Sequence, residues 1–196
     1  FEWSFYMDRR VRKTRLKLNE SLMILIKDKN INQITVKELT DLADINRKTF
    51  YLHYKDIFDM VDNIKEQLLV ELESVILFHN SSCTNSDEPY SLMKDILEFI
   101  DKNSELLSIF LGPHINADSI FIEKIKEIMK RLCIDVWNRL YPNADPKKYD
   151  YYYSFTYYGI IGLIQDWINT SKQESIEYMA KLTSDLVESS SKILYS

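Results

Sequence analysis

Residues that interrupt a regular backbone are scarce in this chain, which holds three glycines and four prolines among 196 residues. An all-β fold of that length would need many tight turns, and glycine and proline are the residues that most often make them. The predicted fold class is therefore all-α, with about nine helices. Hydrophobic residues make up 45% of the chain and charged residues 28%, a balance typical of a folded globular protein.

The segment most informative about function is residues 34–59, with the sequence ITVKELTDLADINRKTFYLHYKDIFD. Thr35 stands at an N-cap position with Glu38 three residues later, as in a capping box, so a short helix is expected to begin there. Apolar residues at helical spacing give that helix a predicted buried side, made of Val36, Leu39, Leu42 and Ala43.

A second short helix is predicted over Arg47–Tyr54, because Asp44–Ile45 can form a tight turn and Asn46 can cap the next helix. Phe50 and Tyr54 are spaced i, i+4 and would both point inward. Two short helices joined by a tight turn predict a helix-turn-helix, whose second helix can enter the major groove of DNA.

A longer helix is predicted before this unit, over residues 9–29, with basic residues crowded into its N-terminal half. Positive charge at a helix N-terminus opposes the helix dipole, so an anionic partner explains the cluster better than helix stability does. A merely solvated basic face is the alternative. Residues 8–55 hold twelve Lys/Arg and six Asp/Glu, whereas the whole chain has a net charge of −5. Such asymmetry is typical of a DNA-binding module attached to an acidic body.

Polar side chains converge on the outer face of the second short helix. They are Arg47, Lys48, Thr49, Tyr51 and His53. Arginine and lysine can donate to guanine, threonine can contact a base or a thymine methyl, and tyrosine and histidine can donate to phosphate oxygens. A lone tyrosine or histidine is usually just packed or solvated, but five such groups beside a basic helix favour a DNA duplex as partner.

The segment 34–56, with a predicted helix on each side, resembles the DNA-binding domain of the TetR/AcrR family of bacterial transcriptional regulators. The matching positions are Thr35, Leu39, Ala43, Ile45, Thr49, Phe50, Tyr51, His53 and Tyr54. Two positions depart from the family pattern, since Asp44 replaces the usual turn glycine and Ile57 stands where a phosphate-binding lysine is common. Aspartate tolerates left-handed geometry, so the turn is expected to survive, and Lys55 is a candidate substitute for the lost contact.

The resemblance implies roles for the residues of this segment. Arg47, Lys48 and Thr49 would read bases. The DNA backbone would be held by Thr35, Lys37, Tyr51, His53 and Lys55, with further contacts from Arg10 and Lys13 at the start of the first helix. The implied protein is a homodimeric, ligand-responsive repressor that binds a palindromic double-stranded operator. The departures at Asp44 and Ile57 motivate an alternative, a family member that does not bind DNA and acts as a co-regulator through protein–protein contacts.

The predicted domains are a helix-turn-helix domain at 8–55 and a helical domain for dimerisation and effector binding at 56–196. Apolar spacing in the second domain predicts helices at 56–78, 90–101, 105–111, 118–141, 147–170 and from about residue 175 onward. The polar run 79–89 is predicted to be a loop.

The last two predicted helices stand out by their apolar surface. Gly159 and Gly162 lie inside a helix, where glycine costs up to about 1 kcal/mol against alanine, so a partner helix or a ligand is expected to approach there. By the resemblance, the two helices form half of an intermolecular four-helix bundle. The predicted dimer interface comprises Tyr158, Gly159, Gly162, Leu163, Met179, Leu182 and Leu186. The tyrosine-rich sequence before Trp167 is also similar to a subgroup that includes the dihydroxyacetone kinase regulators.

Aromatic residues of the body are candidates for an effector pocket, although ordinary core packing is the simpler interpretation of each. The candidates are Phe99, Phe110, Trp137 and Tyr152. The resemblance implies a small-molecule effector but gives no identity for it.

Other classes of protein are disfavoured by what the sequence lacks. The three histidines form no metalloprotease motif, and no phosphate-binding glycine loop or nucleophile elbow occurs, so neither an enzyme, a metal site nor a cofactor is expected. Cys83 and Cys133 form no zinc motif or disulfide framework, which favours a cytoplasmic location. No apolar run reaches the roughly 18 residues of a membrane span, so no membrane insertion is expected.

Overall fold

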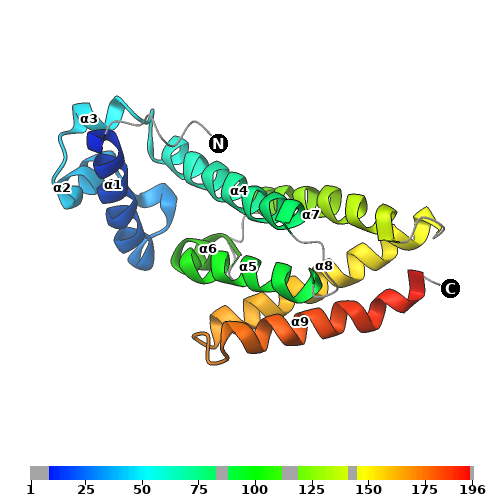
Figure 1. Ribbon diagram of the computed structural model, residues 1–196. Helices are drawn as coiled ribbons and strands as arrows, with labels where there is room; N and C mark the ends of the chain where they lie inside the picture. The colour runs from blue at the N-terminus through cyan, green and yellow to red at the C-terminus, as the bar shows by residue number, and fades with distance from the viewer. Residues whose placement is uncertain (1–8, 83–87, 112–118, 141–144, 195–196) are drawn as a thin grey trace. The chain divides into compact units, whose positions relative to one another are not determined.

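The computed structural model describes residues 9–82, 88–111, 119–140 and 145–194, with the side chains of 80–82, 88, 133, 135–140 and 146 outside the description. Within these ranges all regular structure is helical, which confirms the predicted all-α class (Figure 1). The elements are α1 Arg9–Asp28, the 3₁₀ turn η1 Ile31–Gln33, α2 Val36–Ala43, α3 Arg47–Tyr51, α4 Ile57–Ser82, α5 Glu88–Lys102, α6 Ser104–Leu111, α7 Ser119–Leu140, α8 Pro146–Asn169, α9 Ile176–Ser191 and the 3₁₀ turn η2 Lys192–Leu194.

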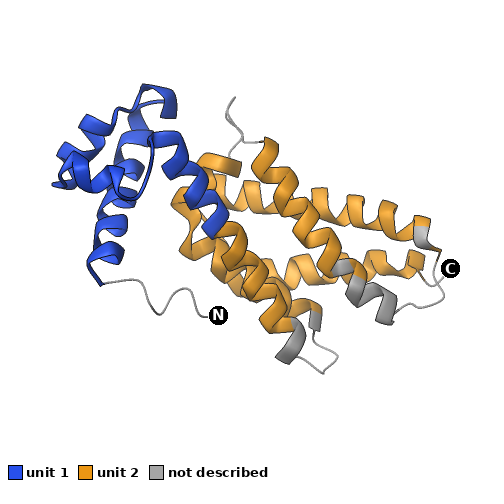
Figure 2. Ribbon diagram, turned by 90° about the horizontal axis from the view of Figure 1, so that it is seen from above, with its two compact units in different colours: residues 1–67 blue, residues 68–196 orange. Residues whose placement is uncertain are grey.

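The chain divides into two compact units, residues 1–67 and residues 68–196 (Figure 2). The division falls inside α4, whereas the sequence pattern predicted a domain boundary at 55/56. The first turns of α4 belong to the N-terminal unit, where four of their apolar residues are buried: Ile57, Met60, Val61 and Ile64.

The core of the N-terminal unit is formed by apolar faces of α1, α2 and α3. Leu18 of α1, Leu39 of α2 and Phe50 of α3 are all fully buried. Leu42 was predicted to join them, and this prediction is wrong, because its side chain is 46% exposed. Thr40 is buried in its place, and its hydroxyl donates to the Val36 carbonyl at 2.7 Å.

The turn between α2 and α3 is formed as the sequence predicted. Asp44 adopts the left-handed conformation with φ 53° and ψ 51°. This geometry is tolerated by aspartate because its short polar side chain can hydrogen-bond locally. The Ile45 N–H donates to the Thr40 carbonyl at 3.0 Å and closes the end of α2. Asn46 then caps α3 by accepting from the Lys48 N–H at 2.8 Å.

Thr35 caps α2 as predicted, by accepting from the Glu38 N–H at 3.2 Å. The Glu38 carboxylate interacts with the Thr35 backbone N–H, as the expected capping box requires, and it also forms an ion pair with Lys29 just after α1. The hydrogen bond from Lys29 lowers the pKa of the Glu38 carboxyl below its ordinary value. This ion pair joins the end of α1 to the start of α2.

Helix α3 is shorter than predicted, since it ends at Tyr51 and not at Tyr54. The Tyr54 N–H still donates to the Phe50 carbonyl at 3.0 Å, and Tyr54 is buried as expected. The chain thus leaves the helix without exposing the Tyr54 ring. Asp56 then caps α4 by accepting from the Asp59 N–H at 2.8 Å.

The C-terminal unit is a bundle of helices in which α8 contributes many of the buried aromatic rings. Three tyrosine hydroxyls of α8 donate to backbone carbonyls elsewhere in the unit: Tyr152 to Val187 at 2.7 Å, Tyr153 to Lys126 at 2.6 Å and Tyr157 to Ile122 at 3.1 Å. These bonds satisfy phenol groups that would be costly to bury without a partner.

Helix α4 extends past its predicted end at residue 78, and the prediction of a loop from residue 79 is wrong over 79–82. His79 is 3% exposed, and its Nδ1 lies 3.0 Å from the Asp95 carboxylate on α5. Because buried polar groups need a partner, the contact between His79 and Asp95 gives a physical reason for α4 to continue through residues 79–82, although this segment is polar. Cys83 lies outside the described residues.

Candidate nucleic-acid interface

Helix α3 presents a polar outer surface opposite its buried residue Phe50. Arg47 and Lys48 are exposed, Thr49 is half-buried, and Tyr51 is 57% exposed. The Tyr51 ring packs edge-on against Phe50, with ring centroids 5.5 Å apart. Because Phe50 is fully buried, it anchors α3 in the core while Arg47, Lys48 and Tyr51 remain on the outer face.

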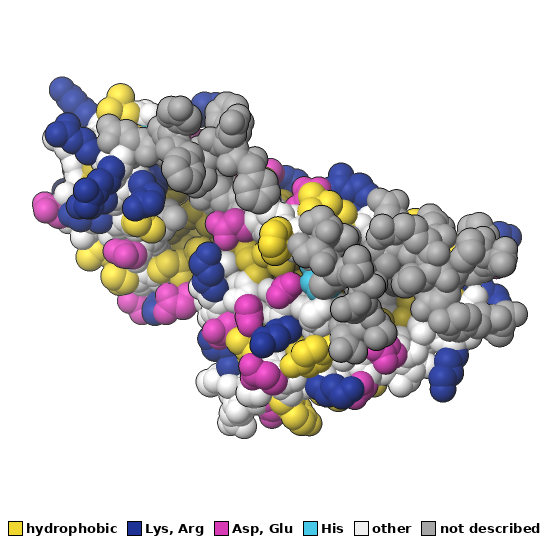
Figure 3. Space-filling view, viewed as in Figure 1, with side chains coloured by type: hydrophobic (Ala, Val, Ile, Leu, Met, Phe, Trp, Pro, Cys, Tyr) yellow, Lys and Arg dark blue, Asp and Glu magenta, His cyan; other side chains and the backbone are white. Residues whose placement is uncertain are grey.

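The residues predicted to hold a DNA backbone belong to the same unit as α3, and Figure 3 shows Lys and Arg side chains gathered on this unit. Lys37 and Lys55 are exposed, as are Arg10 and Lys13 on α1. The Thr35 hydroxyl oxygen accepts from the Glu38 N–H, and its own hydrogen can still be donated. The structure therefore brings the predicted contacts together on one folded unit.

His53 and Tyr54 follow α3 and have altered acid–base properties. Burial lowers the pKa of the half-buried His53 imidazole, and the positive charge of Arg15 lowers it further. Burial also raises the pKa of the Tyr54 phenol, a group that is protonated at neutral pH even without this shift. His53 is correspondingly biased toward its neutral form.

Ile57, at the position where the resembled pattern has a lysine, is 4% exposed and is the first residue of α4. It contributes to the core of the unit and offers no polar group. Lys55, the predicted substitute, is exposed, and its backbone N–H donates to the Asp59 carboxylate at 2.9 Å. The side-chain ammonium is left for another partner.

Two residues near this surface were missed as site candidates. Arg15 of α1 is half-buried, and its guanidinium carbon lies 5.8 Å from the centroid of the Tyr54 ring. Its spacing from Leu18 and Leu22 was the available signal, since i, i+3, i+7 places it on the inner face of the helix.

Leu52 is 79% exposed directly after α3, and an exposed leucine in a polar segment gives no clear sequence signal.

An apolar stripe runs along α8 and α9 in the other unit. Of the predicted interface residues, Tyr158, Gly159 and Leu186 are exposed and Gly162, Leu163 and Leu182 are half-buried, whereas Met179 is already buried inside the protomer. Further exposed apolar residues, which were not predicted for the interface, are Tyr151 and Phe155 on α8, Tyr178 on α9 and Ile193 on η2. No atom lies within 4 Å of a Cβ built on either glycine, so no neighbour within the described chain explains them.

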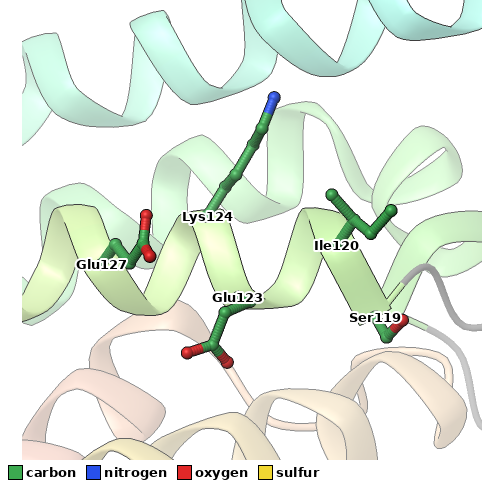
Figure 4. A pocket seen from close by; sticks show the side chains of 5 residues that line it. All are labelled: Ser119, Ile120, Glu123, Lys124 and Glu127. Atoms are coloured by element: carbon green, nitrogen blue, oxygen red, sulfur yellow. The ribbon is translucent and has the colours of Figure 1, made fainter.

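The aromatic residues proposed for an effector pocket are part of the core. Phe99, Phe110 and Tyr152 are all buried, and Phe110 packs on Phe121 with ring centroids 5.3 Å apart. The Trp137 side chain lies outside the described residues. A hollow of about 300 Å³ is lined instead by residues of α7 alone: Ser119, Ile120, Glu123, Lys124 and Glu127. Figure 4 shows these side chains pointing in different directions from one helix, which is not an enclosed ligand site.

Residues 87–189 match the TetR_C_8 family model, which describes a transcriptional regulator C-terminal region. The match covers more than half of the chain. The chain belongs to the TetR/AcrR family of transcriptional regulators. This membership agrees with the family predicted from the helix-turn-helix, and it identifies a regulator and not an enzyme.

Other comparisons agree with the TetR family. The chain is 22% identical over 173 residues to the HTH-type transcriptional regulator YxbF of Bacillus subtilis. The matched region covers 87% of this chain and 43% of that protein. It therefore spans less than half the length of this relative.

Three solved structures share the fold of this TetR-family chain. The fatty acid degradation regulator FadR of Bacillus halodurans has a TM-score of 0.70 at 11% identity and covers 89% of this chain and 94% of its own. FadR of Bacillus subtilis, solved in complex with stearoyl-CoA, has a TM-score of 0.66 at 12% identity and covers 89% and 98%. The dihydroxyacetone kinase operon activator DhaS also shares the fold, with a TM-score of 0.63 at 17% identity over 92% of this chain and 97% of its own. At these identities the likeness shows the fold alone, and membership of the subgroup that includes the dihydroxyacetone kinase regulators stays a prediction.

Two further observations concern this TetR-family chain as described. None of its helices in the described ranges is long and apolar enough to cross a membrane. The described residues also contain no group of three or more His, Cys, Asp or Glu side chains arranged to hold a metal ion.

Proposed function

We propose that this TetR-family regulator binds a palindromic double-stranded DNA operator as a homodimer, with α3 in the major groove. The observation that carries the proposal is the outer face of α3, where Arg47 and Lys48 are exposed at the capped N-terminal end and Tyr51 follows on the same short helix. Arginine and lysine at that end of a recognition helix can reach base edges, and tyrosine can donate to a phosphate.

The backbone contacts are assigned to the surrounding residues. Lys37, Lys55, Arg10 and Lys13 are exposed cations of the same unit, and each can neutralise a phosphate. Phosphate contacts set the register of a protein on the duplex, whereas contacts to base edges set its specificity. Arg47, Lys48 and Thr49 are therefore assigned to bases.

The homodimer is supported by the exposed stripe of α8 and α9. Tyr151, Phe155 and Tyr158 recur at i, i+4 and i+7 along α8, and large exposed apolar groups in such a row mark an interaction surface. Gly159 and Gly162 leave open space beside these rings. A surface that combines large rings with open glycines can fit a second copy of itself about a two-fold axis.

The proposal also includes control of DNA binding by a small-molecule effector. The related FadR of Bacillus subtilis was solved with stearoyl-CoA, so a body of this fold can hold an organic ligand. An effector in the C-terminal unit would relieve repression only by its difference in affinity between the DNA-binding state and another state. The chemical identity of the effector is left open, and we expect the protein in the cytoplasm, where its operator would lie.

A salt titration with mixed-sequence duplex tests DNA binding. The affinity of the full chain, measured by fluorescence anisotropy, is expected to fall by about 10³-fold or more between roughly 50 and 200 mM salt, because several phosphate contacts release counterions. Absence of binding at low salt would contradict the proposal. It would favour the co-regulator alternative, for which the buried Ile57 at the usual lysine position is the specific observation.

Selection of random duplexes by the purified protein would then give the operator. Two half-sites with centres about 34 Å apart are expected from a dimeric helix-turn-helix protein. A single half-site without symmetry would contradict the homodimer on DNA.

A further inference from the structure

Arg15 of α1 is held in an unusual environment for a surface arginine. Its guanidinium carbon lies 5.8 Å from the centroid of the Tyr54 ring, a distance at which a cation is attracted to the face of an aromatic ring. Its Nε atom is buried and has no hydrogen-bond partner, and no carboxylate among the described residues forms an ion pair with it. The charge of Arg15 is therefore not neutralised by the described part of the protomer.

His53 shares the same aromatic support. Its ring centroid lies 6.3 Å from that of Tyr54, and Tyr54 itself is 4% exposed. Burial lowers the pKa of the His53 imidazole, and the positive charge of Arg15 lowers it further. Two potential donors from separate elements, α1 and the segment after α3, thus lie around one buried ring.

The acidic groups near this pair are already engaged. Asp59 of α4 faces Tyr54, but its carboxylate accepts from the Lys55 N–H at 2.9 Å and lies 3.5 Å from the Asn63 amide nitrogen. The remaining cation near the pair, Lys55, has an exposed side chain. Arg15 and Lys55 supply two positive charges here against the single negative charge of Asp59, a balance that favours an incoming anion.

We propose that Arg15 and His53 together bind one phosphodiester of the operator backbone, with Arg15 supplying the charge and His53 a ring N–H. This inference rests on the proposed function, since it names a contact of the same DNA-binding surface. A guanidinium suits a phosphate because its planar N–H groups can donate in parallel.

Arg15→Gln tests the charge, with Lys27→Gln as the matched control because it removes the same charge from the other end of α1. Arg15→Gln is expected to weaken binding of a mixed-sequence duplex about tenfold and to reduce the salt slope by about 0.9, the contribution of one phosphate contact. Lys27→Gln is expected to leave both unchanged, and Arg15→Lys to retain the salt slope. Equal effects of Arg15→Gln and Lys27→Gln overturn the inference, while binding by the wild type keeps the proposed function.

The pH dependence of binding tests His53. In the DNA-free protein, burial and the charge of Arg15 lower the pKa of His53, whereas a bound phosphate would favour the protonated ring. The affinity for duplex is therefore expected to rise as pH falls from about 8 toward about 5.5, with at most tenfold per pH unit for one proton. His53→Gln is expected to remove this dependence, and an unchanged pH profile in that variant overturns the inference.

Nuclear magnetic resonance separates the operator backbone from a free anion and does not rely on a folding-sensitive variant. The imidazole resonance of His53 in the wild type is expected to shift on addition of duplex and not with inorganic phosphate at the same phosphate concentration. A shift with inorganic phosphate alone would overturn the assignment to DNA. Arg15→Lys, which keeps the charge, is expected to leave the pKa of His53 lowered.

Discussion

Replacing Phe50 with alanine is expected to lower the free energy of unfolding of the N-terminal unit by about 3–5 kcal/mol, the usual cost of removing a fully buried phenylalanine. Phe50 is 0% exposed, and its ring packs against both Tyr51 and Tyr54, with centroids 5.5 and 5.6 Å away. Hydrogen exchange of the backbone amides of α2 and α3 would measure the loss of protection directly. DNA binding is expected to disappear with it.

Tyr51→Ala is the matched control, because it removes a neighbouring ring that is mostly exposed. It is expected to weaken DNA binding while changing the protection of α2 and α3 by less than about 0.5 kcal/mol, as surface substitutions usually do. If Phe50→Ala left the amide protection unchanged, α3 would not be held in place by this core.

Substitution of Phe155 by glutamate is expected to convert the proposed homodimer into monomers. The two-fold axis would place two new charges in one apolar interface, and burying unpaired charges is strongly unfavourable. We expect a rise of at least about 100-fold in the dimer dissociation constant, equivalent to about 2.7 kcal/mol. Sedimentation velocity over a range of protein concentrations would measure it.

Val70→Glu on α4 is the control for the dimer experiment, since Val70 is also a large exposed apolar residue but lies outside the α8 and α9 stripe. It is expected to leave the dimer intact. A wild-type chain that sediments as a monomer, or a Phe155→Glu variant that still forms dimers, would contradict the proposed interface.

Local signals in the sequence were sufficient for the helix-turn-helix itself. The caps at Thr35 and Asn46 depend on hydrogen bonds within three residues, and the left-handed turn at Asp44 depends on the chemistry of one side chain. Each of these contacts is made by neighbours in the chain, so a short stretch of sequence contains the information. All three predictions are confirmed.

Tertiary contacts were not accessible in the same way. Helix α4 continues to Ser82 although its last residues are polar, and buried His79 contacts Asp95, sixteen residues away on another helix. Leu42 matched the apolar spacing but is exposed, while Thr40 is buried. Spacing alone gives the period of a helix, whereas the neighbouring helices decide which side is covered.

The candidate site was predictable by residue type more than by environment. Arg47, Lys48 and Tyr51 were chosen for their chemistry, and the structure leaves them exposed on α3. The spacing of Arg15 from Leu18 and Leu22 indicates the inner face of α1, but its position over the Tyr54 ring depends on how α1 packs in the unit. The effector-pocket residues stay a prediction. Those that the structure describes, Phe99, Phe110 and Tyr152, are buried in the core.

The most direct test of the proposed function is the operator affinity of the double variant Arg47→Ala, Tyr51→Phe, measured by footprinting on the selected operator. These changes remove one base-reading group and one phosphate donor from α3, while Phe50 and the caps of the helix remain. We predict a loss of at least about 2 kcal/mol in binding free energy, with relaxed specificity at the bases that Arg47 reads. A loss of less than about 1 kcal/mol, the lower end for one good base contact, would contradict the assignment of α3 as the reading element.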